Sequence, residues 1–167
     1  MIEDENRLYI PPRYIKDQER PVIFLAGPIV GAWDWQAEAT SRLLKENSHI
    51  LVANPRRPEL NADFDYATQV EWETDHLKRA SQLGVILFWL ANEVNHYHER
   101  PFGQTTRIEL GEWMVRHVYE RTRIVLGIDW RFPGAKYIRD RFQAECPNVP
   151  IKNTLAQTCL EALKLLK

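Results

Sequence analysis

Short apolar runs that stop at turn-forming residues constrain the fold of this chain most strongly. The segments 22–26, 49–53 and 85–90 are almost entirely apolar, and the first two end at a Gly-Pro and an Asn-Pro pair. An apolar run without polar alternation is typical of a strand buried on both faces, as in parallel sheets. These three segments therefore predict the centre of a parallel sheet.

Helical periodicity separates these runs, and two weaker strands are predicted over 123–128 and 149–152. Alternating strands and helices predict an α/β domain with a five-stranded parallel sheet and right-handed crossovers. We expect residues 1–20 to form an extended arm and residues 21–167 to form a single domain. The predicted helices cover 35–45, 63 or 65 to 79, 106–119, 137–143 and 154–166.

Length and composition exclude several classes of protein. The 167 residues suit one domain, and 44% hydrophobic with 27% charged residues argues against intrinsic disorder. With 22 basic and 23 acidic residues, no positive excess indicates a nucleic acid polymer as partner. No apolar stretch reaches the ~20 residues of a membrane span, and the two cysteines suit reduced thiols. We expect a cytoplasmic protein with no membrane partner.

Ligands of such sheets bind where the strands end, near the point at which strand order reverses. That rule places segments 27–36, 54–66 and 91–106 around one site. The first of these loops lacks both the dinucleotide-binding glycine pattern and the P-loop ending. His96 and His98 form a pair without a third metal ligand, which is a weak metal signal. We expect no cofactor and no metal.

The segment 106–112, Thr-Arg-Ile-Glu-Leu-Gly-Glu, has two interpretations. Thr106 and Glu109 have the spacing of a capping box, which is a structural role. Alternatively, Glu109 in the first helical turn is ionised by the positive helix end and faces the cleft. Such a carboxylate can attack an electron-poor carbon, for example the anomeric carbon of a sugar. Gly111 is expected to let this helix lie close to the sheet.

Aromatic side chains and a glycine near the first strand end also have two interpretations. Trp33 and Trp35 follow the first loop, where they serve either as core or interface residues or as stacking surfaces for a flat ring. Gly27 either ends the strand in a turn or lets a ligand approach the backbone.

Four segments stand out by their sequence and their order, namely 23–28 with 35–36, 52–57, 69–73 with 76–77, and 108–112. In this order they resemble the nucleoside 2-deoxyribosyltransferase family, especially its branch of short, single-domain members. The resemblance implies a flavodoxin-like three-layer fold and a ping-pong exchange of the base of 2′-deoxyribonucleosides. It also implies nucleosides and free bases as partners.

The resemblance also implies roles for particular residues. Glu109 would hold the sugar as a covalent ester, and Asp75 would protonate the departing base. The residues alone favour a different role for Asp75, as a solvated partner of Lys78 or Arg79. The substrate-binding residues expected from the matched segments and the loop between them are Gly27, Pro28, Trp33, Asn54, Arg56, Gln69 and Trp72.

Departures from the family pattern keep alternatives open. Phe24 and its neighbours offer no hydroxyl where the best-known members carry a tyrosine. Residues 103–104 stand where those members have an aspartate that touches the sugar 5′ hydroxyl. Ribonucleosides are therefore also expected as substrates. One alternative is an N-glycoside hydrolase of nucleosides or nucleoside monophosphates, and another is a non-catalytic nucleotide-binding module.

Two arginines after the second strand bear on these alternatives. Arg56 and Arg57 either bind a phosphate, as a nucleotide hydrolase would require, or form surface pairs with Asp63 or Asp65. A glycosyl ester must also be shielded from water until a base arrives. Because one small sheet offers an open cleft, we expect a homo-oligomer.

Overall fold

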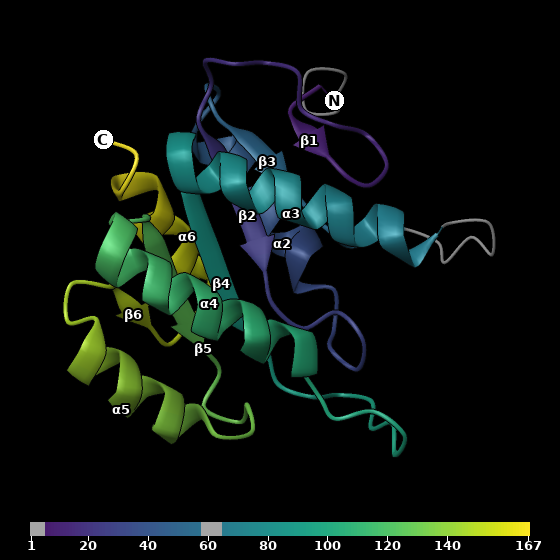
Figure 1. The fold of residues 1–167 in the computed structure, drawn as a ribbon, viewed down its shortest axis with the longest axis vertical. Helices are drawn as coiled ribbons and strands as arrows, with labels where there is room; N and C mark the ends of the chain where they lie inside the picture. The colour runs from purple at the N-terminus through teal and green to yellow at the C-terminus, as the bar shows by residue number, and fades with distance from the viewer. Residues whose placement is uncertain (1–5, 58–64) are drawn as a thin grey trace.

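The computed structural model describes residues 6–57 and 65–167, which form one six-stranded parallel sheet flanked by helices (Figure 1). The strand order is β1-β3-β2-β4-β5-β6. The strands are β1 (Leu8–Tyr9), β2 (Val22–Ala26), β3 (Leu51–Ala53), β4 (Val85–Leu90), β5 (Ile124–Ile128) and β6 (Ile151–Lys152). The helices are α2 (Trp35–Glu46), α3 (Tyr66–Leu83), α4 (Gln104–Glu120), α5 (Ala135–Glu145) and α6 (Leu155–Lys164).

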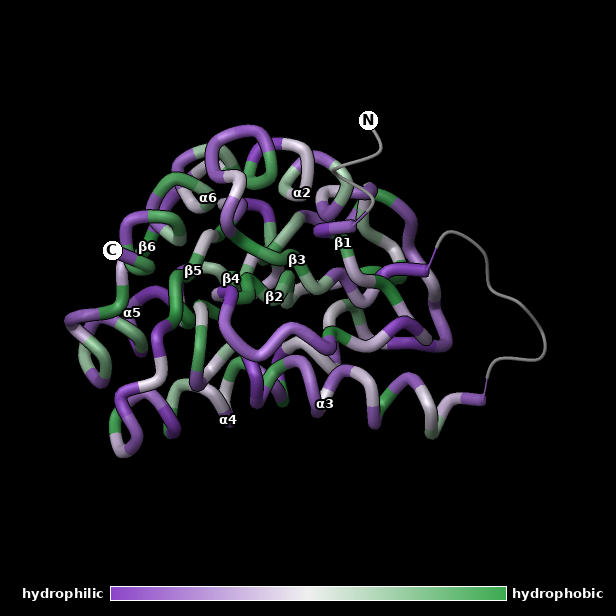
Figure 2. The backbone as a smooth tube through the Cα atoms, turned by 90° about the horizontal axis from the view of Figure 1, so that it is seen from above, coloured by the Kyte–Doolittle hydropathy of each residue, from purple (hydrophilic) through white to green (hydrophobic). Residues whose placement is uncertain are grey.

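The elements form three layers. Helices α2 and α6 cover one face of the sheet, and α3, α4 and α5 cover the other, as seen from above in Figure 2. Successive residues of a strand point to opposite faces. Phe24 accordingly packs in the core on the α3–α5 side, and its neighbour Ile23 packs in the core on the α2–α6 side. Both faces of β2 and β4 are therefore buried, as their apolar runs predict.

This arrangement confirms the predicted flavodoxin-like α/β fold, with one strand more than expected. The sixth strand is β1, which extends the sheet beyond β3 with Leu8 opposite Val52 and Tyr9 opposite Ala53. A two-residue edge strand carries no apolar run, so the sequence pattern does not reveal it. Residues 6–20, expected as an extended arm, thus contribute a strand to the sheet.

Two side chains of α3 anchor this N-terminal segment. The indole Nε1 of Trp72 donates to the carbonyl of Arg13 at 2.9 Å. His76 donates from Nδ1 to the Trp72 carbonyl at 2.7 Å, and its Nε2 accepts from the Ile15 amide at 3.3 Å. Burial lowers the pKa of His76, which agrees with a neutral ring that both donates and accepts. Trp72 is therefore a fully buried core residue.

The switch point of the sheet lies between β2 and β4. From β2 the chain runs through α2 to β3, returns through α3 to β4, and continues in the opposite direction to β5 and β6. Asp65 caps α3 by accepting from the amide of Ala67 at 3.3 Å, whereas the other candidate, Asp63, lies outside the described residues. Within the described ranges, none of the helices has the length and apolarity to cross a bilayer.

Candidate active site

A cavity of about 670 Å³ opens at the carboxyl ends of β2, β3 and β4. Its walls are the loop after β2, residues 55–57 after β3, the loop after β4, and the first turns of α3 and α4. This is the position at which open parallel sheets bind ligands, and the volume is typical of a small-molecule site.

One face of α3 forms a wall of the cavity. Tyr66, Gln69 and Glu73 recur at intervals of three and four residues, which places them on a single helix face. Gln69 donates from Nε2 to Glu73 Oε1 at 2.6 Å and to the Pro55 carbonyl at 3.0 Å. Burial raises the pKa of Glu73, while the Gln69 amide and the positive charge of Arg57 act in the opposite direction.

Helix α4 supplies the second carboxyl group of the cavity, Glu109, beside Thr105 and Thr106. Burial raises the pKa of Glu109 to about 8, and the negative charges of Glu73 and Glu112 add to this rise. This raised pKa favours the neutral form of Glu109, contrary to the ionised state predicted from the sequence. A buried carboxyl group near other acidic groups favours its neutral form.

The predicted capping box at Thr106 and Glu109 is also wrong. Helix α4 begins at Gln104, and its N-cap is Gly103 in the left-handed conformation, with φ 66° and no side-chain cap. Glu109 thus lies in the second turn, beyond the strongest field of the helix N-terminus.

The two glycines that the sequence singles out have different environments. A Cβ on Gly27 would lie 2.3 Å from the Trp89 carbonyl oxygen and 2.7 Å from Cζ2 of Trp35, so no side chain fits there. Gly27 also lines the cavity. A Cβ on Gly111 would meet nothing within 4 Å. The expectation that Gly111 brings α4 close to the sheet is therefore wrong, since this residue is exposed.

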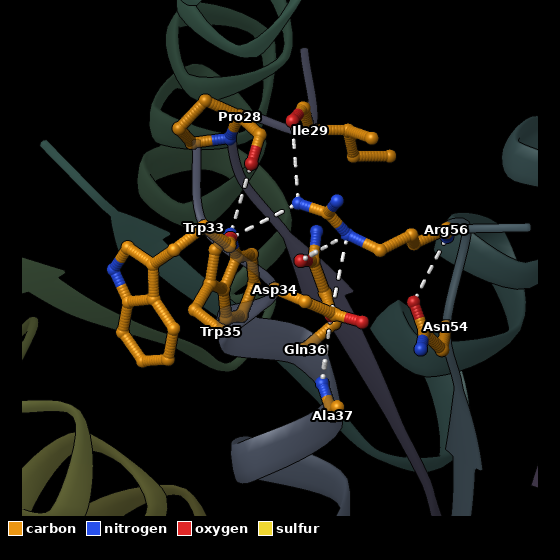
Figure 3. Close-up of polar contacts among 9 residues, drawn as sticks. All are labelled: Pro28, Ile29, Trp33, Asp34, Trp35, Gln36, Ala37, Asn54 and Arg56. Carbon is orange, nitrogen blue, oxygen red and sulfur yellow. Dashed lines mark hydrogen bonds and ion pairs between the residues drawn. The ribbon is translucent and has the colours of Figure 1, made fainter. Parts of the chain in front are cut away.

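Arg56 ties the loop after β2 to the loop after β3 (Figure 3). Its Nε donates to Gln36 Oε1 at 2.9 Å and lies 3.3 Å from the Asp34 carboxylate. Its Nη2 donates to the carbonyls of Ile29 and Trp33 at 3.2 and 3.1 Å. Burial lowers the pKa of Arg56, and Asp34 opposes this shift. Most of the guanidinium is thus used to hold one wall of the cavity in place.

Other cationic side chains border the same space. Arg57 and Arg100 both line the cavity, from the loops after β3 and β4. Arg56 pairs with Asp34 rather than with Asp65, and Asp63 lies outside the described residues.

Four of the predicted site residues meet at the cavity, namely Gly27, Arg56, Gln69 and Glu109. Asn54 does not line the cavity, but its Oδ1 accepts a hydrogen bond from the backbone amide of Arg56 at 2.9 Å. The Pro28 carbonyl accepts from the indole of Trp35 at 2.9 Å (Figure 3), so both residues belong to the loop scaffold. Trp33 packs against the core on the α2–α6 side, and Trp72, a residue of α3, lies in the core on the α3–α5 side.

The structure places Asp75 outside the cavity. Its side chain is 59% exposed, and its carboxylate lies 3.9 Å from Nδ1 of His76. Two residues along a helix correspond to a rotation of about 200°, so Asp75 points away from the wall formed by Glu73. Sequence reasoning missed Glu73, although its spacing of four residues from Gln69 is a usable signal. It also missed Tyr97 and Arg100, whose loop has no periodic pattern.

The fold is that of a flavodoxin-like domain, with a cavity at the switch point that is lined by two carboxyl groups. Residues 20–125 match the family described as nucleoside 2-deoxyribosyltransferase like, and the chain belongs to this family. The match covers more than half of the 167 residues and includes every segment that lines the cavity. This confirms the resemblance stated from the sequence. Curated proteins give no match to the chain.

Proposed function

We propose that the protein transfers the sugar of a nucleoside between bases through a covalent ester on Glu109. The observation that supports this most directly is the pair of carboxyl groups, Glu109 on α4 and Glu73 on α3, lining one cavity. Two carboxyl groups that flank a reacting glycosidic bond can act as nucleophile and as acid. The substrates proposed are 2′-deoxyribonucleosides, with ribonucleosides as a further class.

In the first half-reaction, a carboxylate oxygen of Glu109 attacks C1′ and the bond from C1′ to the base nitrogen breaks. Glu73 gives its proton to that nitrogen, so the base leaves neutral. In the second half-reaction, a new base attacks C1′, the ester bond breaks, and the proton of the incoming base returns to Glu73. We assign the acid to Glu73 rather than Asp75 because Glu73 lines the cavity and Asp75 does not.

Base exchange tests this proposal. The protein is incubated with one deoxynucleoside and a different free base, and the exchanged nucleoside is sought by chromatography. A 2′-fluorinated nucleoside should leave a sugar adduct on Glu109 that intact mass and peptide mapping detect. Glu109→Ala should bind nucleoside without turnover. Absence of exchange with every purine and pyrimidine donor would reject the transferase, and unchanged turnover in Glu109→Ala would reject the nucleophile.

An N-glycoside hydrolase acting on nucleosides or nucleoside monophosphates is the second candidate function. Arg57 and Arg100 line the cavity that contains the carboxyl pair, and guanidinium groups bind phosphate well. The chemistry then differs only in the acceptor, since water replaces the base. Release of free sugar or sugar phosphate without any acceptor base would favour hydrolysis. A reaction that depends strictly on a second base would favour transfer.

We also propose that the protein is a homo-oligomer. Tyr66 at the cavity is 73% exposed, and Ile108, next to Glu109 in sequence, is 71% exposed. A second copy over this region would shield a glycosyl ester from water. Light scattering at micromolar concentration should give a mass above that of one chain, and a monomer would contradict this proposal.

A further inference from the structure

The side-chain amide of Gln69 is fixed in one orientation. Both hydrogens of its Nε2 are used, one toward the Pro55 carbonyl at 3.0 Å and one toward Glu73 Oε1 at 2.6 Å. A carbonyl oxygen can only accept. Turning the amide over would therefore set Gln69 Oε1 against the Pro55 oxygen. An N–H group of Gln69 thus points at Glu73 in the stable arrangement.

The two carboxyl groups of the cavity have unequal surroundings. Burial raises the pKa of Glu73, but the Gln69 hydrogen bond and the positive charge of Arg57 both oppose this rise by favouring the ionised form. Glu109 faces the negative charges of Glu73 and Glu112, and no group in the described part of the chain donates a hydrogen bond to it. The other charged or titratable groups that line the cavity are Arg56, Arg100, Tyr66 and Tyr97.

We propose that Gln69 is a positioning residue that keeps the negative charge of the carboxyl pair on Glu73 and the proton on Glu109 before substrate binds. This inference rests on the proposed function for the roles of the two glutamates. The raised pKa of Glu109, about 8, agrees with this placement of the proton.

The resting protonation is the reverse of the one that glycosyl transfer requires. Attack on C1′ needs an ionised Glu109, and protonation of the leaving base needs a neutral Glu73. One proton therefore moves from Glu109 to Glu73 after the substrate enters. The departing base takes it, the incoming base returns a proton to Glu73, and that proton moves back to Glu109 after release. No proton is gained or lost over the cycle, and before substrate binds the nucleophile is in its unreactive neutral form.

The decisive experiment follows the side-chain carboxyl carbons of ¹³C-labelled glutamates by NMR as a function of pH, without substrate. Glu73→Gln and Glu109→Gln assign the two signals. In the unchanged protein, Glu109 should take up its proton at higher pH than Glu73. In Gln69→Met, which keeps the side-chain length but removes the donor, Glu73 should take up its proton about 1 pH unit higher.

A second variant of Gln69 and a control substitution on the same helix complete the test. Gln69→Glu should raise the pKa of Glu73 further, because it replaces a donor with a negative charge, and it substitutes for Gln69→Met if that variant does not fold. Gln82→Met lies in the same helix, is exposed, and should leave both titrations unchanged. Unchanged titration of Glu73 in both Gln69 variants, or a resting proton on Glu73, would overturn the inference.

Kinetics separate a positioning role from a structural one. If Gln69→Met changes which glutamate carries the proton, the pH profile of kcat/KM should shift along the pH axis. Structural damage alone would lower kcat/KM by the same factor at every pH, and that result would contradict the inference. Because the NMR titration needs no substrate, it also separates the two proposals. If the two glutamates titrate as expected but no base exchange is found, the proposed function is rejected and the inferred position of the proton is supported.

Discussion

The guanidinium of Arg56 donates from Nε to Oε1 of Gln36 at 2.9 Å, across a sequence separation of 20 residues. Gln36 is fully buried in the first turn of α2, and Arg56 follows β3. The same guanidinium binds two carbonyls of the loop between β2 and α2. These contacts hold the loop in place as a preformed wall of the cavity.

Arg56→Lys tests this wall. Lysine keeps the charge but cannot make the forked set of hydrogen bonds, which leaves buried acceptors unpaired. We expect a loss of about 2–4 kcal/mol in the free energy of unfolding, measured with urea. Arg42→Lys on α2 is the control, because Arg42 forms an exposed pair with Glu38 and should change stability by less than about 1 kcal/mol. Equal effects of the two substitutions would contradict the role of Arg56.

Two acidic residues of α3, Glu73 and Asp75, give opposite expectations for catalysis. Glu73→Gln removes the proposed acid from the cavity and should lower kcat/KM for base exchange by about 10²-fold or more. Asp75→Asn changes an exposed side chain and should leave kcat/KM within about twofold, since surface changes away from the site rarely matter. A larger loss of kcat/KM in Asp75→Asn than in Glu73→Gln would indicate that Asp75, and not Glu73, protonates the departing base.

Glu109 should make stability depend on pH. Its pKa is raised from 4.5 to about 8 in the folded protein, so the fold binds a proton that the unfolded chain releases near pH 4.5. The stability contribution of this group is therefore fully present below about pH 4.5 and is lost as pH rises toward 8.

Glu109→Gln removes this pH dependence. The variant should gain about 2–4 kcal/mol relative to the unchanged protein between pH 5 and pH 8, measured by urea unfolding at each pH. Glu38→Gln on α2, where the carboxylate is in an exposed pair with Arg42, should show no comparable gain. A stability difference for Glu109→Gln that stays constant over this pH range would show that the carboxyl group titrates normally.

Two glycine substitutions should have opposite signs. Gly27→Ala places a methyl group 2.3 Å from the Trp89 carbonyl oxygen and should cost about 1–3 kcal/mol or more, because backbone atoms must shift. Gly111→Ala adds a methyl group in open space within a helix and should stabilise the protein by about 0.5–1 kcal/mol. Thermal unfolding of both variants checks this, and destabilisation by Gly111→Ala would contradict the exposed position of that residue.

The apolar runs of the central strands determined the sheet, because a segment without polar residues can only be buried on both faces. They also determined where the cavity lies, since parallel strands that end together bring their following loops to one edge. The position of Glu109 beside that edge followed from the same reasoning. Gly27 lines the cavity for the same reason, whereas Gln69 was expected there only from the family resemblance.

Tertiary structure decided the rest. Which face of α3 lined the cavity depended on how the helix lay against the sheet, and this selected Glu73 over Asp75. Trp72 went to the core because residues 13–15 returned to cover it. The protonation of Glu109 was likewise beyond local sequence, because a pKa depends on burial and on charges from other elements. Residues that share a chain segment can be read from the sequence, whereas residues that share a space are set by packing.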